Sequence, residues 1–527
     1  MLKNKLYLYG SYDSEFNIAP NLHLGVHMLN KIKTFGNDIA VINAATNERM
    51  TFQELAQQSV DIALSLAHIG VKKGDIVAIC SQNRMEYIPI AFGTLLIGAV
   101  LVNVNGTCTG LSLLHRLKSA KCKVLFCPSS KYQENKDSIE TFTEVETTIV
   151  LDGPVEGATH FKDFLSQHAS VEDFEPTPVS GCEDVAIVLF SSGTTGMPKG
   201  VQYTHYNFLC SVQDPSTRIK DDKVVLGSVD WSNSYGIIML FSFLELGATI
   251  VFSADPDAEQ ILDIIQKYKI EIIPTLPTVI AAINAVKDIA KYDTSSLRKI
   301  FVCGTICNER VLDTFKERIP TVELATHYYG LTEVGCICNS KSSKYGHRAG
   351  SVGGVRNIFV VKIVDVETRE PLGPNQRGEI CCKSPSMLRG YIGGEVDYMD
   401  EEGFFKTGDL GYYDEDHYVY VVDRIKDIIK YNSCTVSPSE LEAVLLQHPS
   451  VHEVGVVGAP HEDLQELPTA FVVLRPGARA TEQELKDFFD KNVAHNVMQL
   501  AGGVRFIDQL PRGVGLKVDR KKLRAML

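Results

Sequence analysis

The sequence lacks an excess of positive charge, and this excludes one broad class of partner. Its 527 residues include 52 Lys and Arg against 65 Asp and Glu, which gives a formal net charge of −13. Affinity for nucleic acid depends largely on the neutralisation of phosphates by Lys and Arg, and no basic stripe stands out in this chain. We therefore do not expect nucleic acid as a partner.

Signals for secretion, membrane insertion and zinc binding are also lacking. Residues 1–15 contain no apolar stretch of the kind found in a signal peptide. Residues 87–104 are uncharged, but Pro89, Gly93 and Gly98 and a β-branched ending predict a buried helix that runs into a strand. The 13 cysteines are scattered without the paired spacing of a zinc site, so we expect reduced thiols in an intracellular protein.

The chain is long enough for more than one domain and contains no internal repeat or low-complexity tract. Strand-like apolar runs alternate with helical stretches from residue 51 to residue 304, which predicts an α/β fold with a largely parallel sheet. From about residue 350, short β segments between turn residues predict a small β subdomain. The charged stretch 423–427 predicts a hinge. We expect a large N-terminal domain, residues 1–424, hinged to a small, mobile α+β domain, residues 425–527.

A loop rich in glycine and hydroxyl groups follows the apolar run 185–190, which is typical of a buried strand. Its glycines permit positive φ values, which can point successive backbone N–H groups towards one anion. Its donor side chains are Ser191, Ser192, Thr194, Thr195 and Lys199. No acidic residue interrupts the loop, so its composition suits a polyphosphate. Pro198 and Gly200 flank Lys199, which excludes a Walker A loop, and strand-like residues 201–203 predict a β-hairpin.

Three later segments carry polar groups that suit a nucleotide. Residues 328–333 combine an aromatic face, a hydroxyl and a carboxylate, the groups that suit a base, an anion and a hard cation. Asp409 follows a glycine, in a place where a carboxylate could accept ribose hydroxyls. Lys517 lies in a basic C-terminal stretch. Taken singly, each of these segments is typical of an ordinary turn or of a solvated surface tail.

In their order, the four segments resemble the signatures of the adenylate-forming superfamily. This superfamily comprises acyl-CoA synthetases, coumarate–CoA ligases, beetle luciferases and the adenylation domains of peptide synthetases. The resemblance spans nearly the whole chain and is strongest for the branch of luciferases and coumarate ligases, on the stretch 421–431 and the compact length. It implies that ATP, Mg2+ and coenzyme A are cofactors.

The resemblance also implies roles for individual residues. Tyr329 would stack on adenine, Thr332 would contact a phosphate oxygen and Glu333 would bind magnesium. Asp409 and Arg424 would bind the ribose. The nucleotide-binding set is Ser191, Ser192, Gly193, Thr194, Thr195, Gly196, Lys199, Gly304, Tyr329, Thr332, Asp409, Arg424 and Lys517. The catalytic set is Lys517, Thr332, Glu333 and Lys430.

Three positions depart from the pattern of the superfamily. Leu516 stands where a glycine usually precedes the catalytic lysine, and Ser433 stands where relatives have a glycine that faces coenzyme A. Asn233 occupies the position of a histidine near the acyl carboxylate in luciferases and coumarate ligases. These departures put the geometry of the lysine loop, the transfer to coenzyme A and the handling of the carboxylate in doubt.

The leading hypothesis is an ATP-dependent acid–CoA ligase for a medium- or long-chain fatty acid or a similar carboxylic acid. Residues expected along the acyl tunnel are small or apolar, apart from one bulky wall; they are Gly304, Thr305, Val334, Gly335, Cys336 and Tyr235. One alternative is a luciferase-like enzyme that adenylates its substrate and then reacts it with oxygen. Another is a non-catalytic adenylate-binding relative. We expect a monomer or a weak dimer, in the cytosol or in the peroxisomal matrix, although the C-terminal Ala-Met-Leu is not the Ser-Lys-Leu signal.

Overall fold

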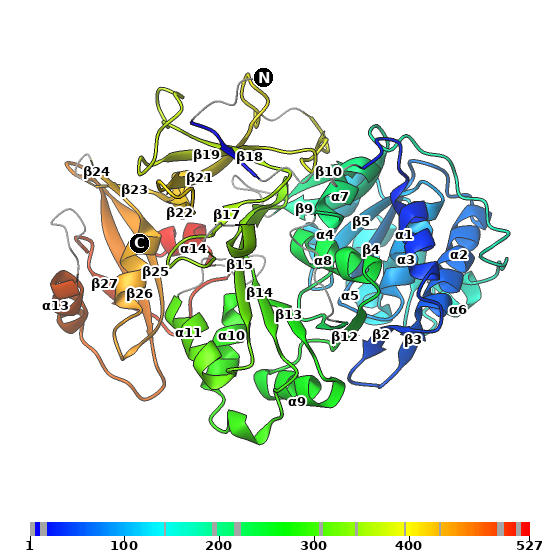
Figure 1. Ribbon diagram of the computed structural model, residues 1–527, viewed down its shortest axis with the longest axis horizontal. Coiled ribbons are helices and arrows are strands. Elements are labelled where there is room, and N and C mark those ends of the chain that lie inside the picture. Colours follow the sequence, from blue (N-terminus) through cyan, green and yellow to red (C-terminus); the bar gives the residue numbers. More distant parts are fainter. Residues whose placement is uncertain are drawn as a thin grey trace.

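Two large β-sheets, a smaller β-sheet and a separate C-terminal lobe make up the computed structural model (Figure 1). The structure describes residues 6–10, 18–141, 144–191, 198–214, 223–304, 309–342, 346–394, 397–431, 434–492, 500–512 and 518–527. The two large sheets lie side by side and the C-terminal lobe lies beyond the second of them, drawn in orange and red in Figure 1.

The first large sheet has eight strands in the order β20-β10-β9-β5-β4-β6-β7-β8. Its strands are β4 (Ile76–Ser81), β5 (Val100–Asn105), β6 (Val124–Cys127), β7 (Thr147–Val150), β8 (Thr159–His160), β9 (Val185–Ser191), β10 (Lys199–Thr204) and β20 (Gly390–Tyr391). The strands from β9 to β8 are parallel, whereas β10 and β20 are antiparallel additions at one edge. The glycine-rich loop therefore connects two strands of a hairpin, as predicted.

The second large sheet has nine strands in the order β17-β16-β15-β14-β13-β11-β12-β2-β3. Its strands are β2 (Ile39–Asn43), β3 (Arg49–Thr51), β11 (Val224–Leu226), β12 (Thr249–Phe252), β13 (Ile272–Thr275), β14 (Lys299–Val302), β15 (Leu324–Leu331), β16 (Gly335–Asn339) and β17 (Gly354–Val355). Six of these strands, from β15 to β2, are parallel. The sequence predicted one largely parallel sheet, and the structure divides the parallel strands between two.

Helices fill the space between the two large sheets and cover their outer faces. The inner helices share one hydrophobic core with both sheets; they are α1 (Leu24–Lys33), α2 (Phe52–His68), α3 (Tyr87–Leu96), α7 (His205–Val212) and α8 (Ser234–Glu245). The outer helices are α4 (Gly110–Ala120) and α5 (Ser129–Glu140) on the first sheet, and α9 (Ala258–Tyr268), α10 (Pro277–Ala285) and α11 (Glu309–Arg318) on the second. The short helix α6 (Phe161–Phe164) follows β8.

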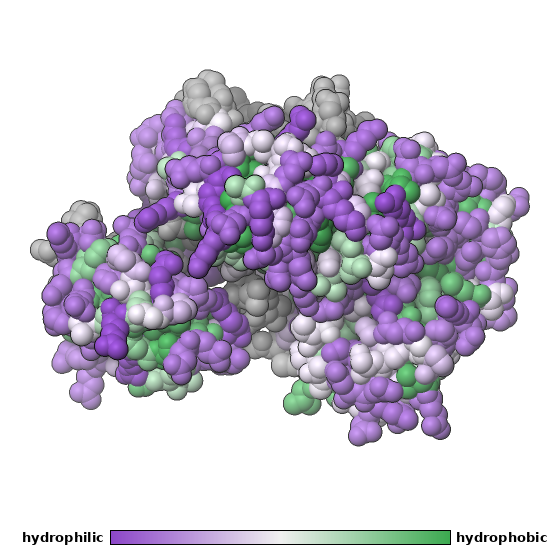
Figure 2. All heavy atoms as spheres, turned by 90° about the horizontal axis from the view of Figure 1, so that it is seen from below, coloured by the Kyte–Doolittle hydropathy of each residue, from purple (hydrophilic) through white to green (hydrophobic). Residues whose placement is uncertain are grey.

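Helix α3 confirms the prediction of a buried helix that runs into a strand, because every one of its residues is buried and β5 follows it. Gly93 allows α2 and α3 to approach closely, since a Cβ there would lie 2.7 Å from the carbonyl oxygen of Ser59. Across the described part of the chain, no helix combines the length and the apolar character needed to cross a membrane. The face seen in Figure 2 is mostly hydrophilic, with hydrophobic residues in scattered groups.

The third sheet forms the small β subdomain that the sequence predicted after residue 350. Its strands are β1 (Leu8–Tyr9), β18 (Val360–Val364), β19 (Gly378–Lys383), β21 (Phe405–Tyr413) and β22 (Val419–Arg424). No pattern in the sequence predicted β1, which pairs Leu8 with Val361 and so brings the N-terminal segment to this sheet.

The C-terminal lobe is a separate sheet with three helices. Its elements are β23 (Ile429–Tyr431), β24 (Cys434–Val436), α12 (Pro438–Leu445), β25 (Val451–His461), β26 (Gln465–Leu474), α13 (Glu482–Asn492), β27 (Val504–Phe506) and α14 (Arg520–Arg524). The described residues also contain the 3-10 helices η2 (Ile289–Lys291), η3 (Ser340–Ser342) and η4 (Ile425–Asp427), the last of which links β22 to this lobe. The predicted fold class is thereby confirmed, while the boundary between residues 424 and 425 stays a prediction.

Polar contacts join the lobe to the small β subdomain. The guanidinium of Arg377 lies 2.8 Å from Oε1 of Glu440. The hydroxyl of Ser437 donates to Oδ2 of Asp423 at 2.8 Å, and the backbone N–H of Ser439 donates to the same oxygen at 2.9 Å. These contacts fix the orientation of the lobe in this structure.

Candidate nucleotide-binding site

The hairpin of strands β9 and β10, here called the phosphate hairpin, has two of the predicted site residues paired at its loop end. Ser191 at the end of β9 pairs with Lys199 at the start of β10. The Nε2 atom of His115, in helix α4, lies 3.0 Å from the carbonyl oxygen of Pro198, and this contact ties the base of the loop to α4. The predicted loop residues Ser192, Gly193, Thr194, Thr195 and Gly196 lie outside the described residues.

A tight turn between β15 and β16 presents Thr332 and Glu333. Gly330 is required before this turn, because a Cβ there would lie 2.2 Å from the carbonyl oxygen of Gly335. The hydroxyl of Tyr203, which is in strand β10, donates to the carbonyl oxygen of Thr332. The hairpin strand is thus bonded directly to the turn, and the two segments form one surface.

The carboxylate of Glu333 is held by a tyrosine from a third segment. The hydroxyl of Tyr391 in β20 donates to Oε1 of Glu333 at 3.1 Å. The ammonium of Lys199 lies over the ring of the same tyrosine, 5.5 Å from its centroid, within the range of a cation–π interaction. Burial and the nearby Glu333 carboxylate raise the pKa of Tyr391, so its hydroxyl stays a donor.

A closed network of three side chains forms the opposite end of the site. The hydroxyl of Tyr329 donates to Oδ2 of Asp409 at 2.7 Å, and Nε of Arg424 lies 2.7 Å from Oδ1 of the same carboxylate. Asp409 in β21 and Arg424 in β22 are paired across the two strands. Gly408 precedes the carboxylate with a φ of +70°, in the left-handed region that suits glycine. The structure therefore brings together the three residues assigned to adenosine.

The surroundings of this network keep its groups in fixed protonation states. Burial and the negative charge of Asp409 raise the pKa of the Tyr329 hydroxyl well above its usual value. Burial opposes the charge on Arg424, but Asp409 and other acidic groups around it raise its pKa overall. Asp409 is only 4% exposed. A nucleotide would therefore meet a buried carboxylate that already has two partners.

Asn233, the residue expected near the acyl carboxylate, lies at the start of helix α8. Asn233 caps this helix, because its Oδ1 accepts the backbone N–H of Gly236 at 2.8 Å. This contact gives the asparagine a structural task at the position where relatives carry a histidine. The next residue, Ser234, places its hydroxyl 3.4 Å from that of Thr332. The first turn of α8 thus adjoins the turn that carries Thr332.

Tyr235, the residue expected as the bulky wall of the acyl tunnel, packs beside a second aromatic residue. Its hydroxyl donates to the carbonyl oxygen of Phe301 at 2.8 Å, and its ring lies 6.3 Å from that of Tyr328. Gly304 follows strand β14 with a φ of +99°, and a Cβ there would lie 2.9 Å from the side chain of Leu276. A glycine at this position therefore permits both the turn and the close packing.

The surroundings of the Glu333 carboxylate suit a magnesium ion. One oxygen accepts from Tyr391, and the other takes no hydrogen bond or ion pair from the described residues. No cluster of three or more His, Cys, Asp and Glu side chains that could hold a metal occurs in the described ranges. Magnesium commonly binds through one or two carboxylates together with substrate phosphates and water, so a single free carboxylate oxygen suffices.

Two predicted lysines are not brought to the site by described contacts. Lys430 in β23 is exposed, and its backbone N–H donates to Oε2 of Glu466 at 2.8 Å within the C-terminal lobe. Lys517 lies outside the described residues, as do Ser433, Leu516 and Thr305. The roles of Lys430 and Lys517 stay predictions.

The sequence missed three residues that contact the predicted ones. They are Tyr203, Ser234 and Tyr391. Tyr203 belongs to the strand-like segment 201–203, and the sequence pattern there indicates no contact with the site. Tyr391 lies in a short segment without a recognisable pattern, and nothing near it in the sequence points to Glu333. Only the pairing of β20 with β10 shows that it belongs to the site.

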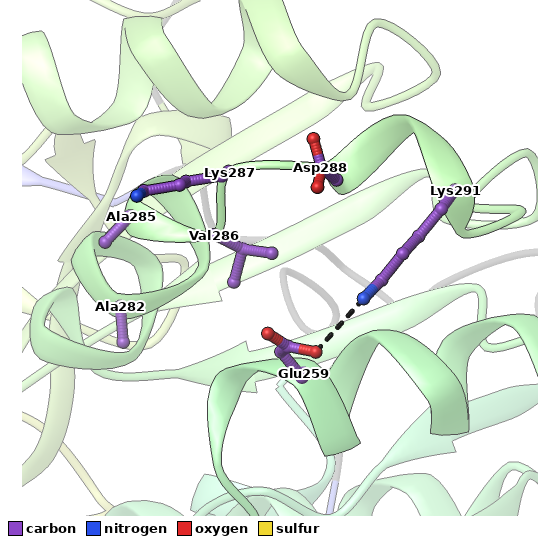
Figure 3. A pocket seen from close by; sticks show the side chains of 7 residues that line it. All are labelled: Glu259, Ala282, Ala285, Val286, Lys287, Asp288 and Lys291. Carbon is purple, nitrogen blue, oxygen red and sulfur yellow. Dashed lines mark hydrogen bonds and ion pairs between the residues drawn. The ribbon is translucent and has the colours of Figure 1, made fainter.

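A pocket of about 450 Å³ lies elsewhere, on the outer helices of the second large sheet (Figure 3). Its lining residues are Glu259, Ala282, Ala285, Val286, Lys287, Asp288 and Lys291. The ammonium of Lys291 lies 3.2 Å from the carboxylate of Glu259, so these two charges neutralise each other. None of the residues assigned to the nucleotide lines this pocket.

Comparison with known proteins shows the family of this chain. A model of the AMP-binding enzyme family matches residues 29–392, and a model of the AMP-binding enzyme C-terminal domain matches residues 440–513. The chain is 34% identical to a luciferin 4-monooxygenase of Nipponoluciola cruciata over 508 residues, which covers 93% of this chain and 91% of the relative. It is 31% identical to 4-coumarate–CoA ligase 1 of Petroselinum crispum, over 97% of this chain and 95% of the relative.

The fold agrees with a solved structure of the same kind. The crystal structure of ATP-bound MatB from Rhodopseudomonas palustris superposes with a TM-score of 0.85 at 25% identity, and the match covers 96% of this chain and 99% of that one. The two family models, the order of the motifs and the relatives all indicate the same family. The chain belongs to the AMP-binding enzyme family, the adenylate-forming enzymes that its motifs resemble.

Proposed function

We propose that this protein is an ATP-dependent acid–CoA ligase. In the first half-reaction a carboxylate oxygen of the acid attacks the α-phosphate of ATP, which gives acyl-AMP and releases pyrophosphate. In the second, the thiolate of coenzyme A attacks the acyl carbonyl carbon, which gives the acyl-CoA thioester and releases AMP. The 4-coumarate–CoA ligases among the relatives favour this pair of reactions.

The observation that carries the proposal is the position of Asp409 between Tyr329 and Arg424. A buried carboxylate beside an aromatic ring provides acceptors for two ribose hydroxyls and a face for a base. The phosphate hairpin and Glu333 supply the groups that a triphosphate and its metal ion would need. The same residues suit ATP as the first substrate and acyl-AMP as the intermediate.

The remaining roles follow from charge. We assign the triphosphate to the hairpin donors and Lys199, and an oxygen of the α-phosphate to Thr332. A magnesium ion at Glu333 would neutralise charge on the triphosphate and orient it for displacement of pyrophosphate. We assign Lys517 to the charge that develops on the carboxylate and the α-phosphate during adenylation. Rotation of the lobe about Lys426 would then replace Lys517 by Lys430 for the transfer to coenzyme A.

For the acid, we propose a medium- or long-chain fatty acid or a similar carboxylic acid with an apolar body. Gly304, Gly335 and Cys336 are small, and Tyr235 forms the one bulky wall. No charged side chain was found among these residues that would bind the ammonium group of an amino acid. We place the protein in the cytosol or the peroxisomal matrix, as a monomer or a weak dimer.

Release of pyrophosphate across a panel of carboxylic acids tests the proposal. The panel contains fatty acids of increasing chain length, cinnamic acids, dicarboxylic acids and amino acids, each with and without coenzyme A. Acid-dependent pyrophosphate release together with a thioester product is the expected result. A preference for cinnamic or dicarboxylic acids would overturn the fatty-acid assignment and leave the ligase assignment intact.

A luciferase-like oxygenase is the second candidate, and it is favoured by the 34% identity to a luciferin 4-monooxygenase. Such an enzyme would form the same adenylate and then react it with oxygen. Incubation with beetle luciferin, ATP and Mg2+ under a luminometer separates the two candidates, because only the oxygenase emits light. Absence of both light and pyrophosphate with every acid would instead support a non-catalytic adenylate-binding protein.

A further inference from the structure

One short segment connects the phosphate hairpin to the turn that carries the metal-binding carboxylate. In the segment 388–392, the backbone N–H of Leu388 donates to the carbonyl oxygen of Glu333 at 2.8 Å. The N–H of Ile392 donates to the carbonyl oxygen of Gly200 at 2.8 Å, just after Lys199. The segment is therefore bonded to both nucleotide-binding elements, which lie far apart in the sequence.

Tyr391 lies at the centre of this segment and contacts the charged group of each element. Its hydroxyl donates to Oε1 of Glu333 at 3.1 Å, while the ammonium of Lys199 lies 5.5 Å from its ring centroid. The ring is held in place edge-on by Tyr398, with 5.3 Å between the centroids and an angle of 86° between the planes. One aromatic side chain thus contacts a cation through its ring and an anion through its hydroxyl.

Lys199 and Glu333 would otherwise be free to bind each other. Opposite charges in a half-buried site attract strongly, and contact between them would occupy the groups that a metal-bound triphosphate needs. In the part of the chain that the structure describes, no ion pair joins them. The ammonium instead meets the ring, and the carboxylate accepts a neutral hydroxyl at one oxygen. Both charges therefore stay available for ligands.

We propose that Tyr391 is a positioning residue that keeps Lys199 and Glu333 apart and orients the Glu333 carboxylate towards metal-bound triphosphate. It acts through these two residues and does not itself touch the nucleotide. The proposal rests on the proposed function only in that the site binds ATP with Mg2+.

The matched variants are Tyr391→Phe, which removes only the hydroxyl, and Tyr398→Phe, which makes the same change in the neighbouring ring. ATP binding is measured by titration calorimetry without any acid substrate, so that no turnover occurs, over a series of Mg2+ concentrations. We expect Tyr391→Phe to raise the Mg2+ concentration for half-maximal ATP binding by about 3- to 30-fold, because the carboxylate loses its orienting hydrogen bond. Binding of AMP without metal should stay within about twofold of the wild type for both variants.

A second variant tests the separation of charges. Tyr391→Leu removes the ring as well, so Lys199 and Glu333 can approach each other, and the Mg2+ requirement should rise further than in Tyr391→Phe. Adding Lys199→Gln to Tyr391→Leu should then bring the Mg2+ requirement back towards that of Tyr391→Phe, although the same change in the wild type weakens ATP binding. Such non-additivity is the expected signature of two groups that interact. Melting temperatures of the unliganded variants show whether each has folded.

The outcomes that would overturn each part of the proposal are distinct. An equal Mg2+ requirement for Tyr391→Phe, Tyr398→Phe and the wild type would overturn the positioning role, and so would equal losses of AMP and Mg·ATP binding in Tyr391→Phe. Strict additivity of Lys199→Gln and Tyr391→Leu would overturn the separation of charges. If the wild type binds neither ATP nor AMP, the proposed function fails together with this inference. If the wild type binds Mg·ATP normally and only the Tyr391 effects are missing, the inference fails alone.

Discussion

The two ends of the nucleotide site are built differently. At the adenosine end, Asp409 is 4% exposed and its two oxygens are occupied by Tyr329 and Arg424. At the triphosphate end, the carboxylate of Glu333 has one oxygen without a partner among the described residues, and Lys199 meets an aromatic ring. The first end is a closed network, while the second holds separated charges.

The difference predicts how much each end contributes to the binding of a nucleotide. Ribose hydroxyls at Asp409 would exchange existing hydrogen bonds for new ones, so this end contributes specificity at a modest net gain. A metal-bound triphosphate would meet a carboxylate with one oxygen that has no partner among the described residues, and an ammonium that faces an aromatic ring, so this end contributes most of the electrostatic attraction. Changes at the two ends should therefore have different signatures in binding and in stability.

The largest expected effect comes from Lys517 in the small domain, which should affect the rate of adenylation more than the binding of ATP. We expect Lys517→Ala to slow acyl-AMP formation by about 100-fold or more, because the charge that grows during adenylation loses its partner. ATP binding should change far less. Rapid-quench assays of acyl-AMP formation, and of thioester formation from supplied acyl-AMP, check this. Equal losses in both half-reactions would contradict the assignment of separate conformations to them.

Asp409→Ala should weaken the closed network in two ways. We expect ATP affinity to fall by about 1.5–3 kcal/mol, as the charge-assisted contacts to ribose are lost. The melting temperature of the unliganded protein should fall as well, because Arg424 and Tyr329 lose their shared partner. Calorimetry and differential scanning fluorimetry measure the two effects. Asp409→Asn is the matched control: it keeps the shape and should keep part of the ribose contact. A weakened ATP affinity without any loss of stability would show that the network is not structural.

Ser433→Gly probes a smaller effect, on the transfer step alone. A serine at a position where relatives have glycine carries a backbone cost of roughly 1 kcal/mol if the backbone must adopt a left-handed conformation. We therefore expect the glycine variant to transfer acyl groups to coenzyme A about fivefold faster at unchanged pyrophosphate release, measured in single turnovers. A slower transfer would indicate that the serine is useful and that the natural acceptor is another thiol or an amine.

The smallest effect on nucleotide binding is expected for Tyr329→Phe. This change removes the Tyr329 hydroxyl as a partner of Asp409, while the aromatic face remains. The free energy of unfolding of the unliganded protein should fall by about 1 kcal/mol, whereas ATP affinity should stay within about threefold of the wild type. Chemical denaturation and calorimetry give the two values. A large loss of ATP affinity would mean that the Tyr329 hydroxyl assists the nucleotide directly, and that the adenosine end is less closed than we infer.

Much of this architecture could be predicted because its signals are local. The apolar run before Ser191 and the glycines after it predict a strand and a turn, and the hairpin is observed where the sequence placed it. The burial of helix α3 follows from a run of residues without charge. Asp409, next to a glycine with positive φ, was recognisable from the same kind of pattern.

The rest depends on contacts between distant segments. Tyr391 reaches Glu333 because β20 pairs with β10 at the edge of the first large sheet. The strand β20 has two residues, which are too few to form a periodic sequence pattern. From the sequence, Asn233 is only a departure from the superfamily pattern near the acyl carboxylate. Its role as the N-cap of α8 depends on where the helix begins. The division of the parallel strands between two sheets likewise follows from packing, since both sets have the same alternating sequence pattern.

The pairing of β1 with β18 has a consequence for synthesis on the ribosome. Leu8 leaves the ribosome early, but its partner Val361 is made roughly 350 residues later. At about 5–20 residues per second, this strand waits of the order of tens of seconds before its sheet exists. An unpaired strand offers backbone hydrogen-bonding groups to other chains, and the two-residue length of β1 keeps that exposed edge short.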